Sequence, residues 1–153
     1  MRGISFLIPN QYGRYLFDIL ESIDMKKYFW KTGGEEAYYI EKNTLGKPLF
    51  PKPCIYSGTE LYSRISEKDY YVIFAELKAF IDKTDVNEIA TYDDFVRSHC
   101  EFVLLIVDCS YVTIYAKDQQ AIARIYAKAV ATGYENTEYI TDENDTRTTL
   151  SVF

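Results

Sequence analysis

The side chains best able to do chemistry gather in one segment, YITDENDTRTTL, which covers residues 139–150. It combines three carboxylates, an amide and one arginine between residue types that favour strands. Such a set could form a polar recognition patch in which Asp142 or Asp145 orients the guanidinium of Arg147. A solvated turn is the simpler interpretation, because Asn144 and Asp145 form turns through hydrogen bonds from their own side chains to the backbone. The sequence therefore predicts a turn first and a recognition patch second.

The same segment is faintly similar to a calcium-binding loop, because Asp142, Asn144 and Thr146 stand at alternate positions. The similarity ends at Arg147, where such a loop needs glycine, and no glutamate closes the loop. An arginine fixed at this place would also repel a cation. We therefore expect no metal site here.

A cysteine next to a histidine is the other arrangement that could be catalytic. His99, the one histidine, adjoins Cys100, but neighbours in a strand point to opposite faces, so a thiolate–imidazole pair is not expected. The familiar glycine-rich phosphate and dinucleotide motifs and the zinc-protease and hydrolase motifs are missing from the sequence. These observations predict no catalytic residue and no cofactor, and they favour a binding protein over an enzyme.

Aromatic residues are abundant, with 15 Tyr, 9 Phe and 1 Trp. Tyrosine joins a large apolar face to a hydroxyl, which suits both sheet packing and recognition surfaces. We expect Tyr111, Tyr115 and Tyr139 to share one sheet face, with Trp30, Tyr38 or Tyr39 beside them. Packing under a helix is the ordinary role for such rings, whereas an open face would offer a platform for a partner.

The elements that must position these residues alternate between strand and helix patterns. Residues 102–107 are continuously apolar and should form the centre of a sheet, paired in a hairpin with residues 111–117. Asp118 and Gly133 should begin and end a helix. Without a regular βαβ alternation, the pattern predicts an α+β fold. We expect a largely antiparallel main sheet with about four helices packed on it, in a single compact domain spanning residues 1–153.

Three further segments carry patterns that predict strands, turns or a covering loop. Residues 28–32 and 35–40 read as two strands joined by a tight hairpin turn at Gly33-Gly34. The last residues, 138–141 and 146–152, read as two strands that flank the acidic turn. Residues 41–56 hold three of the four prolines, and their apolar residues show neither the helix nor the strand periodicity. This pattern predicts either a cover for a sheet edge or a lid over a pocket.

Charge is unevenly distributed along the chain, whose net charge is −6. Residues 1–80 carry 11 basic and 10 acidic side chains, whereas residues 81–153 carry 6 and 13. An acidic balance disfavours nucleic acid and is compatible with a basic protein partner or with solubility alone. The apolar runs are too short for a membrane span, and three cysteines without C-x-x-C spacing fit a reducing compartment, so we expect a cytoplasmic protein that is not bound to a membrane.

Several stretches together resemble one protein family. They are ISFLIPNQYGRYLFDIL, GGEEAYYI, YDDF, VLLIVDCSYVTIYAKD and YITDENDTRTTLSV, which cover most of the chain. The family they resemble consists of small proteins of unknown function from Bacillus-type Gram-positive bacteria. The resemblance implies a bacterial, cytoplasmic protein of one domain and carries no activity with it.

Three functional hypotheses remain open, of which the third is a structural or self-assembling protein. The first is a non-enzymatic binding module, in one version a protein that neutralises a basic protein partner. The second is a small-ligand sensor or enzyme with a pocket under the 41–56 loop. The candidate binding residues are Tyr115, Tyr139, Asp142, Asn144, Asp145, Arg147, Trp30 and Glu36.

Overall fold

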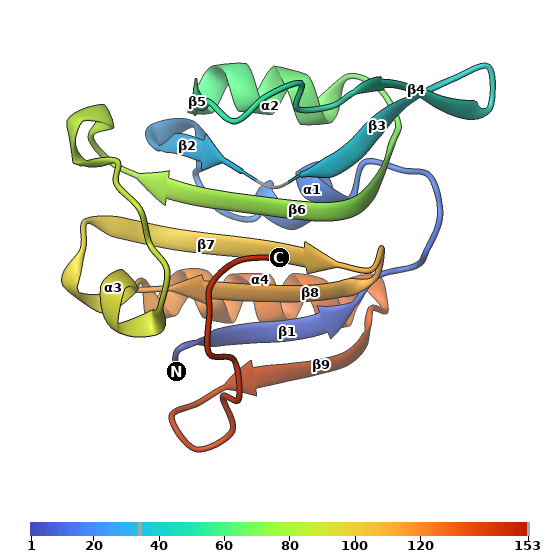
Figure 1. Cartoon of the computed structure of the whole chain (residues 1–153). Coiled ribbons are helices and arrows are strands. Elements are labelled where there is room, and N and C mark those ends of the chain that lie inside the picture. Colours follow the sequence, from blue (N-terminus) through green and yellow to red (C-terminus); the bar gives the residue numbers. More distant parts are fainter. Residues whose placement is uncertain (34, 153) are drawn as a thin grey trace.

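Nine strands, four α-helices and two short 3-10 helices form the part of the chain described by the computed structural model, residues 1–33 and 35–152 (Figure 1). In chain order these elements are β1 (Gly3–Leu7), α1 (Tyr15–Leu20), η1 (Met25–Lys27), β2 (Phe29–Thr32), β3 (Glu36–Glu41), β4 (Thr44–Pro48), β5 (Ile55–Ser57), α2 (Gly58–Ser66), β6 (Tyr70–Phe80), η2 (Lys83–Asp85), α3 (Tyr92–Arg97), β7 (Cys100–Val107), β8 (Tyr111–Ala116), α4 (Gln119–Thr132) and β9 (Glu135–Ile140).

One open sheet contains all the strands, in the order β4-β3-β6-β7-β8-β1-β9, with β2 pairing β6 and β5 pairing β2. The named strand pairs are antiparallel, which confirms the predicted α+β fold with its largely antiparallel sheet. The β7–β8 hairpin lies near the middle of the order, as predicted from its apolar run. Asp108 and Cys109 take left-handed conformations in its turn.

The predicted hairpin between residues 28–32 and 35–40 is wrong. β2 and β3 both run antiparallel to β6, with Thr32 opposite Leu77 and Glu36 opposite Phe74. The chain thus continues along β6, an 11-residue strand long enough to pair with both runs. Gly33 lies in the interruption between them, and Gly34 lies outside the described residues.

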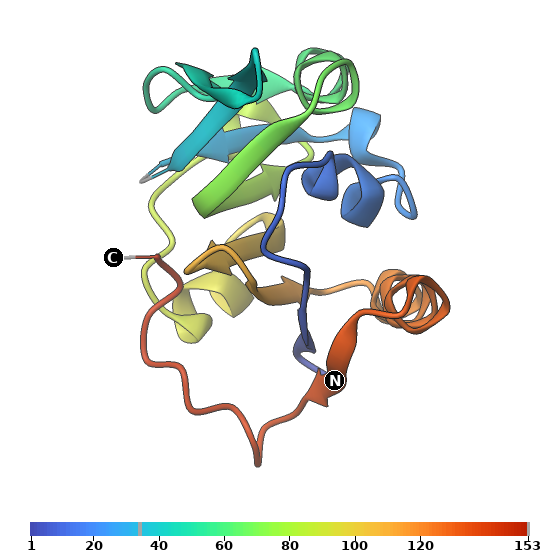
Figure 2. The same ribbon diagram turned by 90° about the vertical axis from the view of Figure 1, so that its right-hand side faces the viewer.

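The two faces of the sheet carry different covers, which we call the helical face and the strap face. On the helical face, α1, α2 and α4 pack over the larger apolar core, which includes Leu16, Leu61 and Ile125 (Figure 2). On the strap face, α3 and the C-terminal residues cover a smaller core that includes Phe95 and Leu150. Residues 146–152, which form this second cover, are called the C-terminal strap.

The helix ends follow the sequence signals. Ser57 and Glu60 form a capping box at the start of α2, and the carboxylate of Asp118 accepts hydrogen bonds from the first turn of α4. Gly133 ends α4 with φ +88°, a left-handed conformation that glycine adopts without strain. No helix of residues 1–33 or 35–152 is long and apolar enough to cross a membrane.

The 41–56 segment is more regular than its sequence indicates. It contributes β4, which pairs with β3 at one edge of the sheet, and the first part of β5. Leu49 and Phe50, which follow β4, are buried in the larger core. The segment therefore covers a sheet edge, which is one of the two alternatives its composition predicted.

The predicted strand over residues 146–152 is also wrong, whereas the turn before it forms at Asp142, Glu143 and Asn144. The chain does not fold back beside β9. It crosses the strap face in an extended path because Leu150 and Val152 are buried with Ile140 in the smaller core (Figure 1).

Candidate functional site

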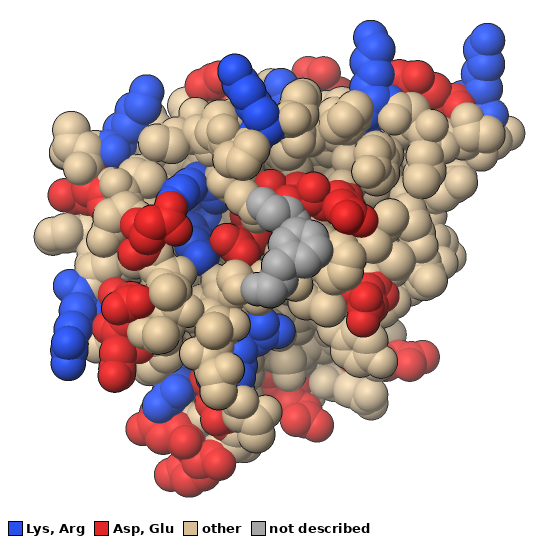
Figure 3. Space-filling view, in the orientation of Figure 1, with Lys and Arg blue, Asp and Glu red and all other residues tan. Residues whose placement is uncertain are grey.

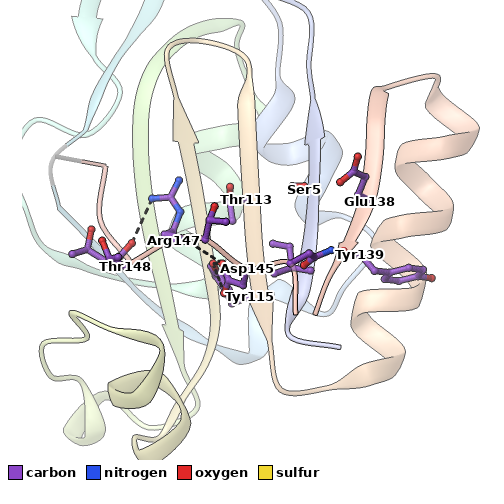
Figure 4. A pocket seen from close by; sticks show the side chains of 12 residues that line it. Ser5, Thr113, Tyr115, Glu138, Tyr139, Asp145, Arg147 and Thr148 are labelled. Atoms are coloured by element: carbon purple, nitrogen blue, oxygen red, sulfur yellow. Dashed lines mark hydrogen bonds between the residues drawn. The ribbon is translucent and has the colours of Figure 1, made fainter. Parts of the chain in front are cut away.

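A polar pocket of about 500 Å³ lies between the C-terminal strap and the sheet. Strands β1, β8 and β9 supply one wall, and residues 144–149 supply the other (Figure 4). Hydroxyl side chains are frequent in the lining, contributed by Ser5, Thr113, Thr146, Thr148 and Thr149. Hydroxyls both donate and accept hydrogen bonds, so this lining suits a polar ligand.

Three polar side chains form a row across the floor of the pocket. Ser5 in β1 lies opposite Thr113 in β8 and, on its other side, opposite Glu138 in β9. Directly opposed residues place their side chains on one face, with Cβ atoms about 4.5–5.5 Å apart. The rest of this face buries apolar side chains such as Leu105 and Ile140. A polar row on an otherwise apolar face marks the place where the strap leaves the sheet uncovered.

Asp145 holds the strap against the sheet. Its carboxylate accepts hydrogen bonds from the Tyr115 hydroxyl at 3.0 and 3.1 Å, from Arg2 Nη1 at 3.1 Å and from the backbone N–H of Arg147 at 3.2 Å. Only 4% of the Asp145 side chain is exposed. Burial raises the pKa of Tyr115 above its ordinary range, and the negative charge of Asp145 raises it further. The Tyr115 hydroxyl is therefore held as a neutral donor.

Arg2 connects the buried cluster of Asp145 and Tyr115, which we call the node, to the surface of the molecule. Its Nε donates to Asp142 at 2.8 Å, and its guanidinium carbon lies 4.0 Å from the ring centre of Tyr92, the first residue of α3. The hydrogen bond to Asp142 raises the pKa of Arg2, so the guanidinium stays charged. Sequence reasoning missed Arg2, because only the pairing of β1 with β9 brings it to residues about 140 positions away.

Two hydrogen bonds donated by backbone N–H groups fix the far end of the strap. The N–H of Leu150 donates to the carbonyl of Ala90 at 2.8 Å, and the N–H of Val152 donates to Glu76 Oε1 at 3.1 Å. Together with Asp145, these contacts hold the strap at both ends of the pocket. The pocket is therefore part of the folded structure and does not depend on a loop closing.

The predicted role of Arg147 is corrected by these contacts. Neither Asp142 nor Asp145 orients its guanidinium, which donates to the strap carbonyls of Thr149 at 3.5 Å and Ser151 at 3.1 Å. The carboxylates are directed to Arg2 instead, because Arg2 enters from β1 on the sheet side of the turn. Arg147 lines the pocket, and no carboxylate of residues 1–33 or 35–152 lies within ion-pair distance of it.

The structure brings together some of the predicted binding residues and not others. Those that line the pocket are Tyr115, Tyr139, Asn144, Asp145 and Arg147. The Asn144 side chain supports the turn, since it accepts from the N–H of Thr141 at 2.7 Å and donates to the carbonyl of Tyr139 at 2.9 Å. Asp142 is outside the lining, with 81% of its side chain exposed.

Two of the predicted residues, Trp30 and Glu36, and the ring of Tyr139 lie away from the pocket. The Tyr139 ring stacks on the ring of Tyr126 in α4, with 4.1 Å between the ring centres. It therefore lies on the helical face and does not share a face with Tyr115 (Figure 4). Trp30 is fully buried and donates from Nε1 to the carbonyl of Met25. Glu36 is exposed at the start of β3, at the other end of the sheet order. Neither Trp30 nor Glu36 contacts the pocket.

Cys100 is unsuited to act as a nucleophile. It is buried, its thiol donates to the carbonyl of Phe102, and burial raises its pKa to about 11. His99, just before β7, is exposed. Within the described ranges, no group of three or more His, Cys, Asp or Glu side chains is arranged to hold a metal ion.

Comparison with known proteins identifies the family. The family model described as "Protein of unknown function (DUF2691)" matches residues 1–151, so the chain belongs to this family, and the predicted resemblance is confirmed. The chain is 43% identical over 151 residues to "Uncharacterized protein YncE" of Bacillus subtilis (strain 168), with 99% of each chain covered. No solved structure matches the chain.

Proposed function

We propose that the protein is a non-enzymatic binding module that takes up a small polar ligand in the pocket under the C-terminal strap. The observation that carries this proposal is the row of Thr113, Ser5 and Glu138, which faces the pocket. Elsewhere the strap face buries apolar side chains. A volume of about 500 Å³ lies within the range of small-molecule sites.

The lining indicates the chemistry of the ligand. Arg147 offers a positive charge, Glu138 offers a negative charge, and Ser5 and Thr113 supply hydroxyls on the floor between β8 and β9. Arginine recognises carboxylates well because its planar guanidinium can make two parallel hydrogen bonds. We therefore expect a small hydroxy acid or amino acid.

Binding is favoured over acid–base catalysis because the titratable groups at the back of the pocket are already engaged. Asp145 accepts hydrogen bonds from Tyr115 and Arg2, and it is almost fully buried. A general base must be within reach of a substrate proton and free to take it. Asp145 lines the pocket, but its oxygens already accept hydrogen bonds from Tyr115, Arg2 and the backbone of Arg147, so it is not free to take a proton.

The alternative that the protein neutralises a basic partner has weaker support. Exposed acidic side chains gather over the turn after β9, at the lower end of Figure 3. Arg2 pairs with Asp142 and Asp145, which removes two of the carboxylates that would attract such a partner. We also propose a cytoplasmic location, which the free thiols of Cys54, Cys100 and Cys109 support.

The proposal is tested by following backbone amide signals by NMR while adding L-malate, L-glutamate or glycerol. Binding of one of the acids should shift the signals of the strap and of the polar row. The double variant Ser5→Ala with Thr113→Val should lose these shifts, whereas Ser63→Ala, an exposed change in α2, should keep them. Absence of shifts with all three probes at about 10 mM, or shifts that persist in the double variant, would overturn the proposal.

A further inference from the structure

A second hollow, of about 390 Å³, lies at the opposite end of the sheet from the strap. It is bounded by β3 and β4, by the segment that follows β4, and by the C-terminal end of α2. We call it the basic hollow, because Lys47, Arg64 and Lys68 all line it and Glu41 is its one acidic lining residue. Basic side chains are also prominent along the upper edge of Figure 3, where Figure 1 places β4 and α2.

None of the three cations forms an ion pair within the described part of the chain, although the pKa of Glu60, which a backbone hydrogen bond lowers most, is also lowered by the charge of Arg64. Within residues 1–33 and 35–152, no carboxylate lies within ion-pair distance of Lys47, Arg64 or Lys68. The chain as a whole has a net charge of −6, so acidic side chains are plentiful. The lining therefore carries three positive charges against the one negative charge of Glu41, which gives a local positive field that an anion would complete.

Arg64 is held in place before any ligand arrives. Its Nη1 donates to the carbonyl of Leu49 at 2.9 Å, and its guanidinium carbon lies 4.9 Å from the ring centre of Tyr56. The hydroxyl of Tyr39 donates to the backbone carbonyl of Arg64 at 3.1 Å, which fixes the helix end against β3. A guanidinium fixed in this way loses little freedom when it binds an anion.

Ordinary structural roles explain the cations only one at a time. Arg64 and Lys68 lie at the end of α2, where positive charge stabilises the helix dipole. Lys47 belongs to the edge strand β4, where lysine discourages pairing with other chains. Neither role accounts for all three side chains lining the same hollow.

We propose that the basic hollow binds a small phosphate monoester. Lys47 and Lys68 would contact the phosphate as mobile point charges, and Arg64 would contact it with fixed donors. Tyr39, Pro48 and Pro51 also line the hollow and would pack against the organic part of the ligand. This site shares no lining residue with the pocket under the strap, so the two proposals are independent.

The test is a calorimetric titration with glycerol 3-phosphate, with glycerol as the uncharged control. Lys47→Gln combined with Lys68→Gln should weaken binding at least about tenfold, because two charged contacts are lost. The matched control is Lys42→Gln combined with Lys52→Gln, which removes the same charge from two exposed lysines of the same region that do not line the hollow. It should change affinity by less than about twofold, apart from long-range screening.

Each outcome decides the question. Binding of glycerol 3-phosphate that is lost in the first double variant and kept in the second supports the site. Equal weakening in both double variants would show a diffuse charge effect and overturn it, as would an affinity weaker than about 10 mM for the wild-type protein. The Ser5→Ala, Thr113→Val variant should bind glycerol 3-phosphate normally, which separates failure of this site from failure of the strap pocket.

Discussion

Replacing Glu35 by Gln should stabilise the protein, and the effect should grow with pH. Glu35 lies in the interruption between β2 and β3, directly before β3, and its Oε1 accepts a hydrogen bond from the N–H of Gly33 at 2.6 Å. Burial raises the pKa of Glu35 to about 7 from its ordinary value of 4.5, and the negative charge of Glu76 raises it further. The folded protein therefore holds a proton on Glu35 that the unfolded chain releases at lower pH.

The size of this effect on the free energy of unfolding follows from the difference between the pKa values of Glu35 in the folded and unfolded states. A carboxyl pKa raised to about 7 from 4.5 corresponds to at most about 3 kcal/mol of stability. This stability is fully present below about pH 4.5 and is lost as the pH rises through about 7. Glu35 is only partly buried, and solvent screens some of the cost, so we expect about 2 kcal/mol.

Urea denaturation of the wild-type protein and Glu35→Gln at about pH 4 and pH 8 measures this difference. Glutamine keeps an oxygen that can accept from Gly33 and cannot ionise, so the variant should match the wild type at the lower pH and exceed it by about 2 kcal/mol at the higher pH. Glu36→Gln is the control, because it removes an exposed carboxylate one residue away and should change stability by less than about 0.5 kcal/mol at both pH values. An equal stability difference between Glu35→Gln and the wild type at the two pH values would refute the reasoning.

Three further changes test the packing that forms the strap pocket, each by urea denaturation. Asp145→Asn should cost about 2–3 kcal/mol, because it removes a buried charge that accepts from Arg2 and Tyr115; a loss below about 0.5 kcal/mol would show that the node does not hold the strap. Leu105→Ala should cost about 2–5 kcal/mol through the cavity left in the smaller core, and a smaller loss would mean that the strap side relaxes into the space. Gly133→Ala should cost about 1 kcal/mol, because a side chain is strained at φ +88° while nothing within 4 Å obstructs it; a neutral result would contradict the assigned helix end.

The features predicted correctly from the sequence are those decided locally. The start of α4 needs only Asp118, whose carboxylate accepts from backbone N–H groups of the first turn, and the left-handed end of α4 needs only a glycine after the last buried turn. The apolar run of β7 identifies the sheet centre because few other structures bury both faces of a strand. Signals of this kind depend on neighbouring residues in the sequence and not on partners elsewhere in the fold.

The wrong predictions concern segments whose structure depends on distant partners. Two adjacent glycines permit either a tight turn or an interruption in a strand, and the length of β6 decides between them. The threonine-rich start of the strap favours an extended backbone, but it lies across the strap face because Leu150 and Val152 bury their side chains there. Local pattern could not distinguish these alternatives, since each satisfies the same residue preferences.

The candidate site was only partly predictable for the same reason. Alternation in β1 places Ser5 between Gly3 and Leu7 on one face, so a lone polar residue there was a usable signal. Its neighbours in the row, Thr113 and Glu138, become neighbours only through the order β8-β1-β9, which no spacing in the sequence reveals. A pocket assembled from three strands and a crossing segment leaves no compact motif, and this explains why the polar residues of YITDENDTRTTL were noticed while Arg2, the cation they bind, was not.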